Sequence, residues 1–399
     1  MTETRAVLLF DMDGVLVAPL GYRHAVVATV LHFAHRLGLE PPPPADADMA
    51  EYEAHGITSE WDMVPLMLAA LLEAAAARGW PLPAAWPPVG AAPVPRARRF
   101  VVPQVDYRAP AARVAATLPD AAFPAAHAAR LQQGPNPPFP RLAARPDLTA
   151  ALFAHSRDTR RSPITRAFQH YVLGSETFAR TYGQGPDFPT ASYLLAHDRP
   201  LPAAPWRDGL YRAWQAGRVA LAVMTARPSR PHPDAVGYAP EAEMALQRIG
   251  WPAAPHIGYG HVRAATADGE GYLKPHPAHA LAALHAALTR DATASLPWAL
   301  AVLATPARAR ALLPPRLALT VVEDSPPGLR AAQAAAAVLR AAGVPVDLNL
   351  VGVAAHPAKR QALAALGARV ASSLDAAVAQ GWLPRYTTEE HGANADLHG

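Results

Sequence analysis

The sequence predicts a doubly wound α/β fold with a mainly parallel sheet and an inserted, mainly α-helical second domain. Three observations lead to this prediction: short apolar runs that read as buried strands, amphipathic segments between them, and one long helical interruption after the first run. Alternation of strands with helices favours a parallel sheet covered by helices on both faces.

Four runs rich in Val, Leu and Ala predict the strands. They are continuously apolar rather than alternating, which is typical of strands buried on both faces. The runs are "AVLLF" (6–10), "VALAVM" (219–224), "LALTVV" (317–322) and "VDLNLVGVA" (346–354).

The segments between the later strands have helical spacing. They are 240–250, 276–288 and 327–343, and the last begins with proline and stops at glycine. Proline suits the first turn of a helix and glycine its end, so these residues favour helix boundaries at both positions.

The interruption defines the predicted domains. A core of 1–17 plus 206–384 surrounds the insertion 18–205, and we expect a disordered tail over 385–399. Within the insertion, helices are predicted at 22–38, 57–79 and both ends of 165–183. The Pro/Ala-rich stretch of about 80–147 lacks periodicity and reads as a linker, an irregular excursion or disorder, and a smaller insertion occupies about 289–316.

Composition excludes several classes of function. The chain has 399 residues, a net charge of +4 and no cysteine, so disulfides, thiolate metal sites and a cysteine nucleophile are excluded. Acids and bases are interspersed, which gives no nucleic-acid footprint. The N-terminus has no signal-peptide pattern and no apolar run reaches the length of a membrane span, so we expect a cytoplasmic protein. The oligomeric state stays open.

A parallel sheet binds its ligands beyond the carboxyl ends of its strands. Polar residues follow the predicted strands at these ends. Each alone could be a helix cap or a turn residue. Together they bring several carboxylates, one hydroxyl and one cation to one edge. These residues are Asp11, Asp13, Thr225, Glu323 and Asp324 after the strands, and Lys274 before a helix.

Lysine is rare in this chain. Only Lys274 and Lys359 occur, against thirty-four arginines. A lysine that persists in an arginine-rich chain suggests a need for a compact point charge. We expect one of the two to serve the site and the other to be incidental.

Four segments, "FDMDGVLV", "MTARP", "LKPHP" and "VVEDSPPG", resemble in order the four motifs of the haloacid dehalogenase (HAD) superfamily. The chain looks most like its phosphatase and β-phosphoglucomutase branch, with a helical cap after the first strand. The resemblance covers about 1–17 and 206–382. Departures are Val17-Ala18-Pro19, where the family often has an Asp-Ser pair, and the 289–316 insertion.

The resemblance implies a role for each motif residue. Asp11 would be the nucleophile, and Asp13 the general acid and then the general base. Thr225 and Lys274 would contact the transferring phosphoryl group. The implied Mg²⁺ ligands are the Asp11 carboxylate, the Asp13 carbonyl and Asp324, with Glu323 as the alternative or water-mediated ligand.

Further residues are candidates for shaping the site or holding substrate. Gly14 would let the chain turn so that both aspartates face one site. Arg227 could reach a second anionic group or be a surface arginine. In the insertion, Arg23 and Asp62 are candidate substrate contacts, although Thr58 through Asp62 also fits a capping box.

The predicted function is therefore a Mg²⁺-dependent phosphatase acting on a small phosphorylated metabolite through an aspartyl-phosphate. The alternatives are a phosphomutase of the β-phosphoglucomutase type and a non-catalytic phosphate-binding protein. Dehalogenase chemistry is disfavoured because it does not need Asp13. Phosphonatase chemistry through a cap lysine is disfavoured because residues 18–205 contain no lysine.

Overall fold

The computed structural model describes residues 4–119, 122–266 and 269–385, and its chain divides into two compact units. One, the core unit, combines the chain up to Pro19 with the chain from Asp198 onward; the other, the inserted unit, is Leu20–His197. The chain returns to the core unit earlier than the predicted residue 206, because the two-residue strand β5 (Arg199–Pro200) pairs with β2 (Val17–Ala18). Strands this short leave no pattern in the sequence.

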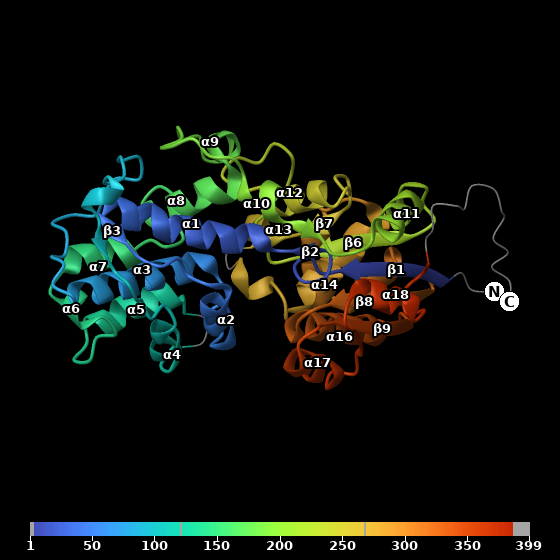
Figure 1. The fold of residues 1–399 in the computed structure, drawn as a ribbon. Coiled ribbons are helices and arrows are strands. Elements are labelled where there is room, and N and C mark those ends of the chain that lie inside the picture. The colour runs from blue at the N-terminus through green and yellow to red at the C-terminus, as the bar shows by residue number, and fades with distance from the viewer. Residues whose placement is uncertain (1–3, 120–121, 267–268, 386–399) are drawn as a thin grey trace. The chain divides into compact units, whose positions relative to one another are not determined.

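The core unit is built on a six-stranded parallel sheet with the order β10-β9-β8-β1-β6-β7, so the predicted doubly wound α/β class is confirmed (Figure 1). All four predicted strands are present. Two short edge strands, β7 and β10, were not predicted. The strands are β1 (Thr4–Phe10), β6 (Ala220–Met224), β7 (His256–Ile257), β8 (Arg316–Glu323), β9 (Val346–Val353) and β10 (Arg369–Ala371).

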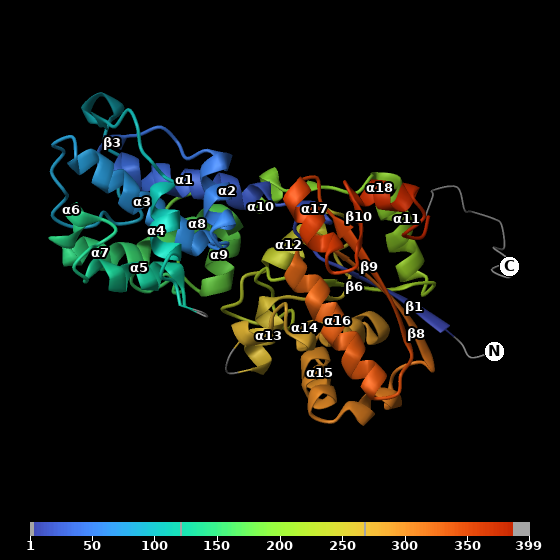
Figure 2. The ribbon, with the colours of Figure 1, turned by 90° about the horizontal axis from the view of Figure 1, so that it is seen from below.

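Helices cover both faces of the sheet because alternate residues of each strand point to opposite sides. Val7 and Leu9 of β1 join the hydrophobic cluster under α14, α15 and α16, whereas Leu8 and Phe10 join the cluster under α11, α12 and α18. Figure 2 shows α15 and α16 on one side of the sheet and α11 and α18 on the other. The helices of the core unit are α11 (Ala204–Gln215), α12 (Glu241–Arg248), α13 (Tyr259–Ala265), α14 (Pro277–Thr289), α15 (Ser295–Ala304), α16 (Pro326–Ala341), α17 (Pro357–Ala364) and α18 (Leu374–Ala379).

The 289–316 insertion contributes to the hydrophobic core of the core unit. It contains α15 and the 3₁₀ turn η3 (Pro306–Ala311), and Leu296, Ala299 and Val302 are buried in the cluster under α14. A second 3₁₀ turn, η2 (Glu270–Tyr272), precedes Lys274.

The inserted unit is mainly helical, as expected from its amphipathic segments. Its elements are α1 (Leu20–Arg36), β3 (Leu39–Glu40), α2 (Asp46–Ala54), α3 (Glu60–Ala76), η1 (Arg96–Arg98), β4 (Phe100–Val101), α4 (Ala109–Ala115), α5 (Pro124–Gln132), α6 (Pro140–Ala143), α7 (Pro146–Phe153), α8 (Pro163–Leu173), α9 (Ser175–Tyr182) and α10 (Tyr193–His197). The three predicted helical segments correspond to α1, α3 and the pair α8 and α9, which meet at Gly174.

The prediction of an irregular or disordered stretch over 80–147 is wrong where short helices and a strand interrupt that stretch. Residues 81–95 lack regular structure, but α4, α5 and α6 follow, and β4 pairs with β3. Each of the three helices has a proline in its first turn and is at most 9 residues long, too short for a periodic apolar pattern to be recognised.

Two further expectations concern the C-terminal tail and membrane-spanning helices. The tail predicted from residue 385 falls, after Arg385, outside the described residues. Within the described ranges, the helices contain no span with the length and apolar character needed to cross a membrane.

Candidate functional site

The site lies at the carboxyl ends of three adjacent strands, and β1 is in the middle. Asp11 follows Phe10, the last residue of β1, whose neighbours in the sheet are Val223 of β6 and Val322 of β8. Glu323 ends β8 and Asp324 comes next. Ligand oxygens of Asp11, Glu323 and Asp324 lie within 4.8 Å of one another. Three of the four predicted carboxylates therefore meet at one edge of the sheet.

Lys274 is the cation that joins two of these carboxylates. Its Nζ lies 2.7 Å from Asp11 Oδ1 and 2.8 Å from Glu323 Oε1, and its side chain is 9% exposed. Burial lowers the pKa of the ammonium, but the charges of Asp11 and Glu323 outweigh this and hold its pKa above the usual value. Lys274 therefore stays protonated beside Asp11.

His279, in the first turn of α14, holds the backbone that carries Lys274. The Lys274 amide donates to His279 Nδ1 at 3.1 Å, and Nε2 lies 3.0 Å from the Ile257 carbonyl at the end of β7. Burial is the main cause that lowers the pKa of His279, to about 4. A neutral imidazole that accepts at Nδ1 must carry its proton on Nε2, so it donates to Ile257. This histidine thus ties Lys274 to the sheet.

The carboxylates are crowded with negative charge. Burial, and next the charge of Asp11, raises the pKa of both Glu323 and Asp324. Lys359 opposes this at Asp324, since its Nζ lies 2.6 Å from Oδ2. With all three carboxyl groups ionised, the cluster carries one negative charge more than its two ammonium groups neutralise, and a further cation would favour that ionised state.

Two glycines make room for these acids. At Gly14, φ is +76°, and a Cβ would lie 2.4 Å from Asp324 Oδ2. At Gly328, in the first turn of α16, a Cβ would lie 1.9 Å from Glu323 Oε1. Gly14 is therefore needed for the turn after Asp13 and also for the approach of Asp324, a second reason that the sequence did not disclose.

Thr225 and Asp13 occupy the same edge. Thr225 follows β6 and is buried; its hydroxyl oxygen accepts from the Arg227 amide at 3.1 Å, and a hydroxyl that accepts there keeps its own hydrogen for another partner. Asp13 lies in the turn after β1, where the Gly14 amide donates to the Val17 carbonyl at 2.9 Å. The side chain of Asp13 is 35% exposed.

Arg227 is not available for a second anionic group of a substrate. Its side chain is 2% exposed and divided between two carboxylates, Asp13 and Asp198. Both open readings of this residue, a substrate contact and a surface arginine, are therefore corrected: it is a buried arginine at the site.

Arg23 and Asp62 have partners inside the inserted unit. Arg23 pairs with Glu53 at 2.8 Å. Asp62 is buried; one of its oxygens accepts from Arg157 at 2.6 Å and the other from the Ala125 amide at 3.0 Å. Because the Asp62 side chain is buried and both of its oxygens are bonded, the expectation that it contacts substrate is corrected. The capping-box alternative for Thr58 through Asp62 is not formed either, because the N-cap residue of α3 is Ser59 and it makes no side-chain capping bond.

Several residues at the site were not predicted. The sequence analysis expects only one of the two rare lysines, Lys274 and Lys359, to serve the site. In the structure both lysines contact the carboxylate cluster. Gly328 lies in the "EDSPPG" segment and could have been found there. His279 and Asp198 carry no signal in one sequence, because their roles depend on contacts with distant residues.

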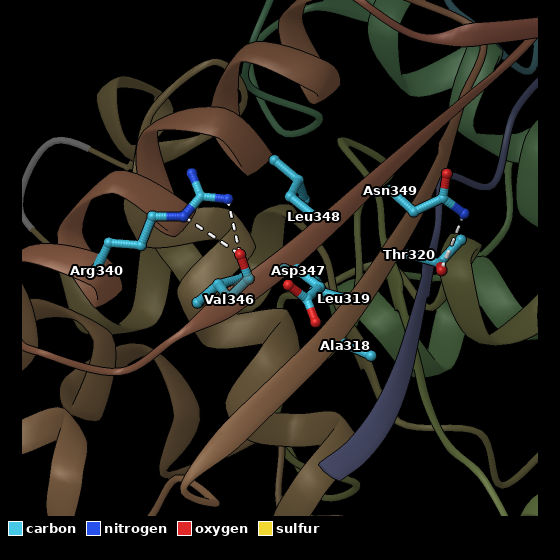
Figure 3. Close-up of a pocket in the computed structure, with 8 residues that line it drawn as sticks. All are labelled: Ala318, Leu319, Thr320, Arg340, Val346, Asp347, Leu348 and Asn349. Atoms are coloured by element: carbon cyan, nitrogen blue, oxygen red, sulfur yellow. Dashed lines mark hydrogen bonds between the residues drawn. The ribbon is translucent and has the colours of Figure 1, made fainter.

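A hollow of about 410 Å³ lies elsewhere on the core unit (Figure 3). It is lined by β8, β9 and Arg340 of α16, whose guanidinium donates to the Val346 carbonyl, and Asn349 donates to Thr320. None of the residues of the carboxylate cluster lines it, so it is not the site described here.

Comparisons with known proteins agree with the fold and leave the activity open. No family model and no curated protein matches the sequence. An X-ray structure of a Northeast Structural Genomics Consortium target is similar, with a TM-score of 0.58 and 14% identity over 96% of this chain and 98% of that one. A phosphatase from Thermococcus thioreducens gives a TM-score of 0.41 and 16% identity over 87% of this chain and 92% of that one. The first likeness supports the fold alone, and the second is too weak to support an argument.

Proposed function

We propose that the chain is a Mg²⁺-dependent phosphatase of the haloacid dehalogenase type that hydrolyses the phosphoric monoester of a small metabolite. One observation carries the proposal: Asp11 directly follows β1, its carboxylate contacts the buried Lys274 ammonium, and it lies within 4.8 Å of ligand oxygens of two further acids. The resemblance of the four motifs supports the same chemistry.

Asp11 would attack the phosphorus atom. Its Oδ1 accepts hydrogen bonds from Lys274 Nζ and from the Met12 amide, each at 2.7 Å, which orients the carboxylate. A bond forms between an Asp11 oxygen and phosphorus while the bond from phosphorus to the alcohol oxygen breaks. Asp13 donates its proton to that oxygen, so the leaving group departs as a neutral alcohol.

The second step would regenerate the enzyme. Asp13, now a carboxylate, takes a proton from water as the water attacks the phosphorus of the aspartyl-phosphate. The bond between phosphorus and Asp11 breaks, and inorganic phosphate leaves. Lys274 and the Thr225 hydroxyl would hold phosphoryl oxygens during both steps.

The residues present fit a magnesium ion. Carboxylate and carbonyl oxygens are the ligands that Mg²⁺ takes in proteins, and the excess negative charge of the cluster favours a divalent cation. Asp11, Asp324 and the Asp13 carbonyl would hold it, with Glu323 as the alternative or water-mediated ligand. The cation would supply positive charge that offsets the repulsion between the Asp11 carboxylate and a phosphate.

The test is release of inorganic phosphate from p-nitrophenyl phosphate and from a panel of phosphorylated metabolites, with and without Mg²⁺. We expect turnover that a chelator abolishes, and Asp11→Asn should lower kcat by at least ~10³-fold, the scale on which loss of a nucleophile acts. Absence of turnover on the whole panel, or full activity of Asp11→Asn, contradicts the proposal. Conversion of a sugar 1-phosphate into its 6-phosphate without free phosphate would instead establish a mutase.

A further inference from the structure

The guanidinium of Arg227 donates hydrogen bonds to both oxygens of the Asp13 carboxylate. Nε of Arg227 lies 3.0 Å from Asp13 Oδ1 and 2.9 Å from Oδ2, and Nη2 lies 2.5 Å from Oδ1. We propose that Arg227 is a positioning residue that aims Asp13 as the general acid, and that Asp198 anchors Arg227. This inference rests on the proposed function, because it assigns a proton-transfer role to Asp13.

Asp13 needs such a partner because of its place in the chain. It lies in a turn rather than in a strand, and its side chain is 35% exposed. A carboxylate in this setting can rotate, whereas proton transfer requires one geometry. The planar fork of a guanidinium fixes both the position and the plane of a carboxylate.

Arg227 is itself held by a second carboxylate. Nη1 donates to Asp198 Oδ2 at 2.9 Å, and the side chain of Asp198 is 0% exposed. Asp198 is the first residue of the core unit after the inserted unit, and its carbonyl accepts from Arg248 Nε at 2.9 Å. A buried guanidinium between two carboxylates is satisfied on both sides, and loss of the Asp198 carboxylate takes from Nη1 the acceptor that holds it in place.

The backbone of Arg227 is also fixed. Its carbonyl accepts from the Tyr259 amide at 2.9 Å, and its amide donates to Thr225. A Cβ at Gly258 would lie 2.8 Å from the Arg227 carbonyl oxygen, so the glycine allows this close approach. Arg227 is thus anchored at both its backbone and its guanidinium, which suits a residue that positions another.

The contacts also select an oxygen on Asp13. Oδ1 accepts from both Nε and Nη2, whereas Oδ2 accepts from Nε alone. Oδ2 therefore has fewer donors and is the oxygen that the guanidinium leaves more open for a substrate.

The experiment separates acid catalysis from general damage by changing the leaving group. p-Nitrophenolate is a stable anion and leaves without a proton, whereas the oxygen of an alkyl leaving group must receive a proton from a general acid. The measurement is kcat/KM, which reports only the steps up to phosphorylation of Asp11, for p-nitrophenyl phosphate and for the best alkyl phosphate of the panel. Arg227→Lys and Asp198→Asn should each lower the alkyl value by ~10–100-fold, part of what general acids contribute, and the aryl value by less than about threefold.

Matched controls come from the opposite end of the sheet. Arg316 and Asp347 form an exposed ion pair at 2.9 Å at the amino ends of β8 and β9, and Arg316→Lys and Asp347→Asn should change neither value. If Arg227→Lys does not fold, Asp198→Asn carries the test. In an Asp13→Asn background, Asp198→Asn should have no further effect on the alkyl substrate.

The outcomes distinguish the two proposals. Equal losses on aryl and alkyl substrates, no loss on either, or a full effect of Asp198→Asn in the Asp13→Asn background would overturn the positioning role. A wild type that is inactive on both substrates contradicts the proposed function instead.

Discussion

At the scale of single residues, Lys359 contacts Asp324, one of the three acids that could hold a metal ion. Its Nζ lies 2.6 Å from Asp324 Oδ2, and its side chain is 53% exposed. An exposed ion pair of this kind is worth up to about 1 kcal/mol. Lys359→Met should therefore tighten Mg²⁺ binding by up to about fivefold, measured by calorimetric titration of the protein without substrate.

The neighbouring residue provides the control for Lys359. Arg360 is also exposed on α17, so Arg360→Met removes the same charge without touching Asp324. Its effect on Mg²⁺ binding should be the smaller. Equal effects of the two variants would show that Lys359 acts only through the general electrostatic field, and weaker binding by Lys359→Met would show that it orients Asp324.

Gly14 combines two constraints that a substitution can separate. Alanine there meets a φ of +76° and places its Cβ 2.4 Å from Asp324 Oδ2. Gly217 has a φ of +74° with nothing within 4 Å of its Cβ position. Both alanine variants should lose about 1–2 kcal/mol of stability in urea unfolding, but only Gly14→Ala should also lose Mg²⁺ binding and activity. Retention of both by Gly14→Ala would show that Asp324 moves without consequence.

At the scale of elements, α14 holds the Lys274 loop through one histidine. His279→Leu would leave the Lys274 amide without its acceptor, at a cost of about 1–3 kcal/mol, whereas the Ile257 carbonyl keeps the Thr225 amide as a donor at 3.0 Å. His285 of the same helix is also buried, but its partner Ser295 keeps a second bond to the Asp291 carbonyl. His279→Leu should therefore destabilise the protein more than His285→Leu and should also lower kcat. Equal losses of stability in urea unfolding would count against this role.

The elements that could be predicted are those long enough to show a pattern. Apolar runs identified β1, β6, β8 and β9, and the residues directly after them supplied most of the carboxylate cluster. The edge strands β7 and β10 have 2 and 3 residues, which is too few for any periodicity. Contacts such as Arg227 with Asp198 depend on chain segments that meet only in the folded protein.

At the scale of the whole molecule, the buried histidines predict sensitivity to acid. Burial is the main cause that lowers the pKa of His32 in the inserted unit and of His261 in the core unit, each to about 3. The unfolded chain binds protons at these sites near pH 6.5, whereas the folded chain does not, so stability falls as pH drops from about 6.5 toward 3. At pH 5 each histidine should cost about 2 kcal/mol relative to pH 7.

The contribution of one imidazole can be isolated by comparing pH slopes. His261→Leu loses the bond to Ser229 and is expected to be less stable at pH 7, but its free energy of unfolding should fall less between pH 7 and pH 5 than that of the wild type. Carboxylates titrate in both proteins, so the difference in slope belongs to the histidine. His232→Leu replaces an exposed histidine and is the matched control variant. Parallel slopes for His261→Leu and wild type would mean that the folded protein takes up a proton at His261 as readily as the unfolded chain.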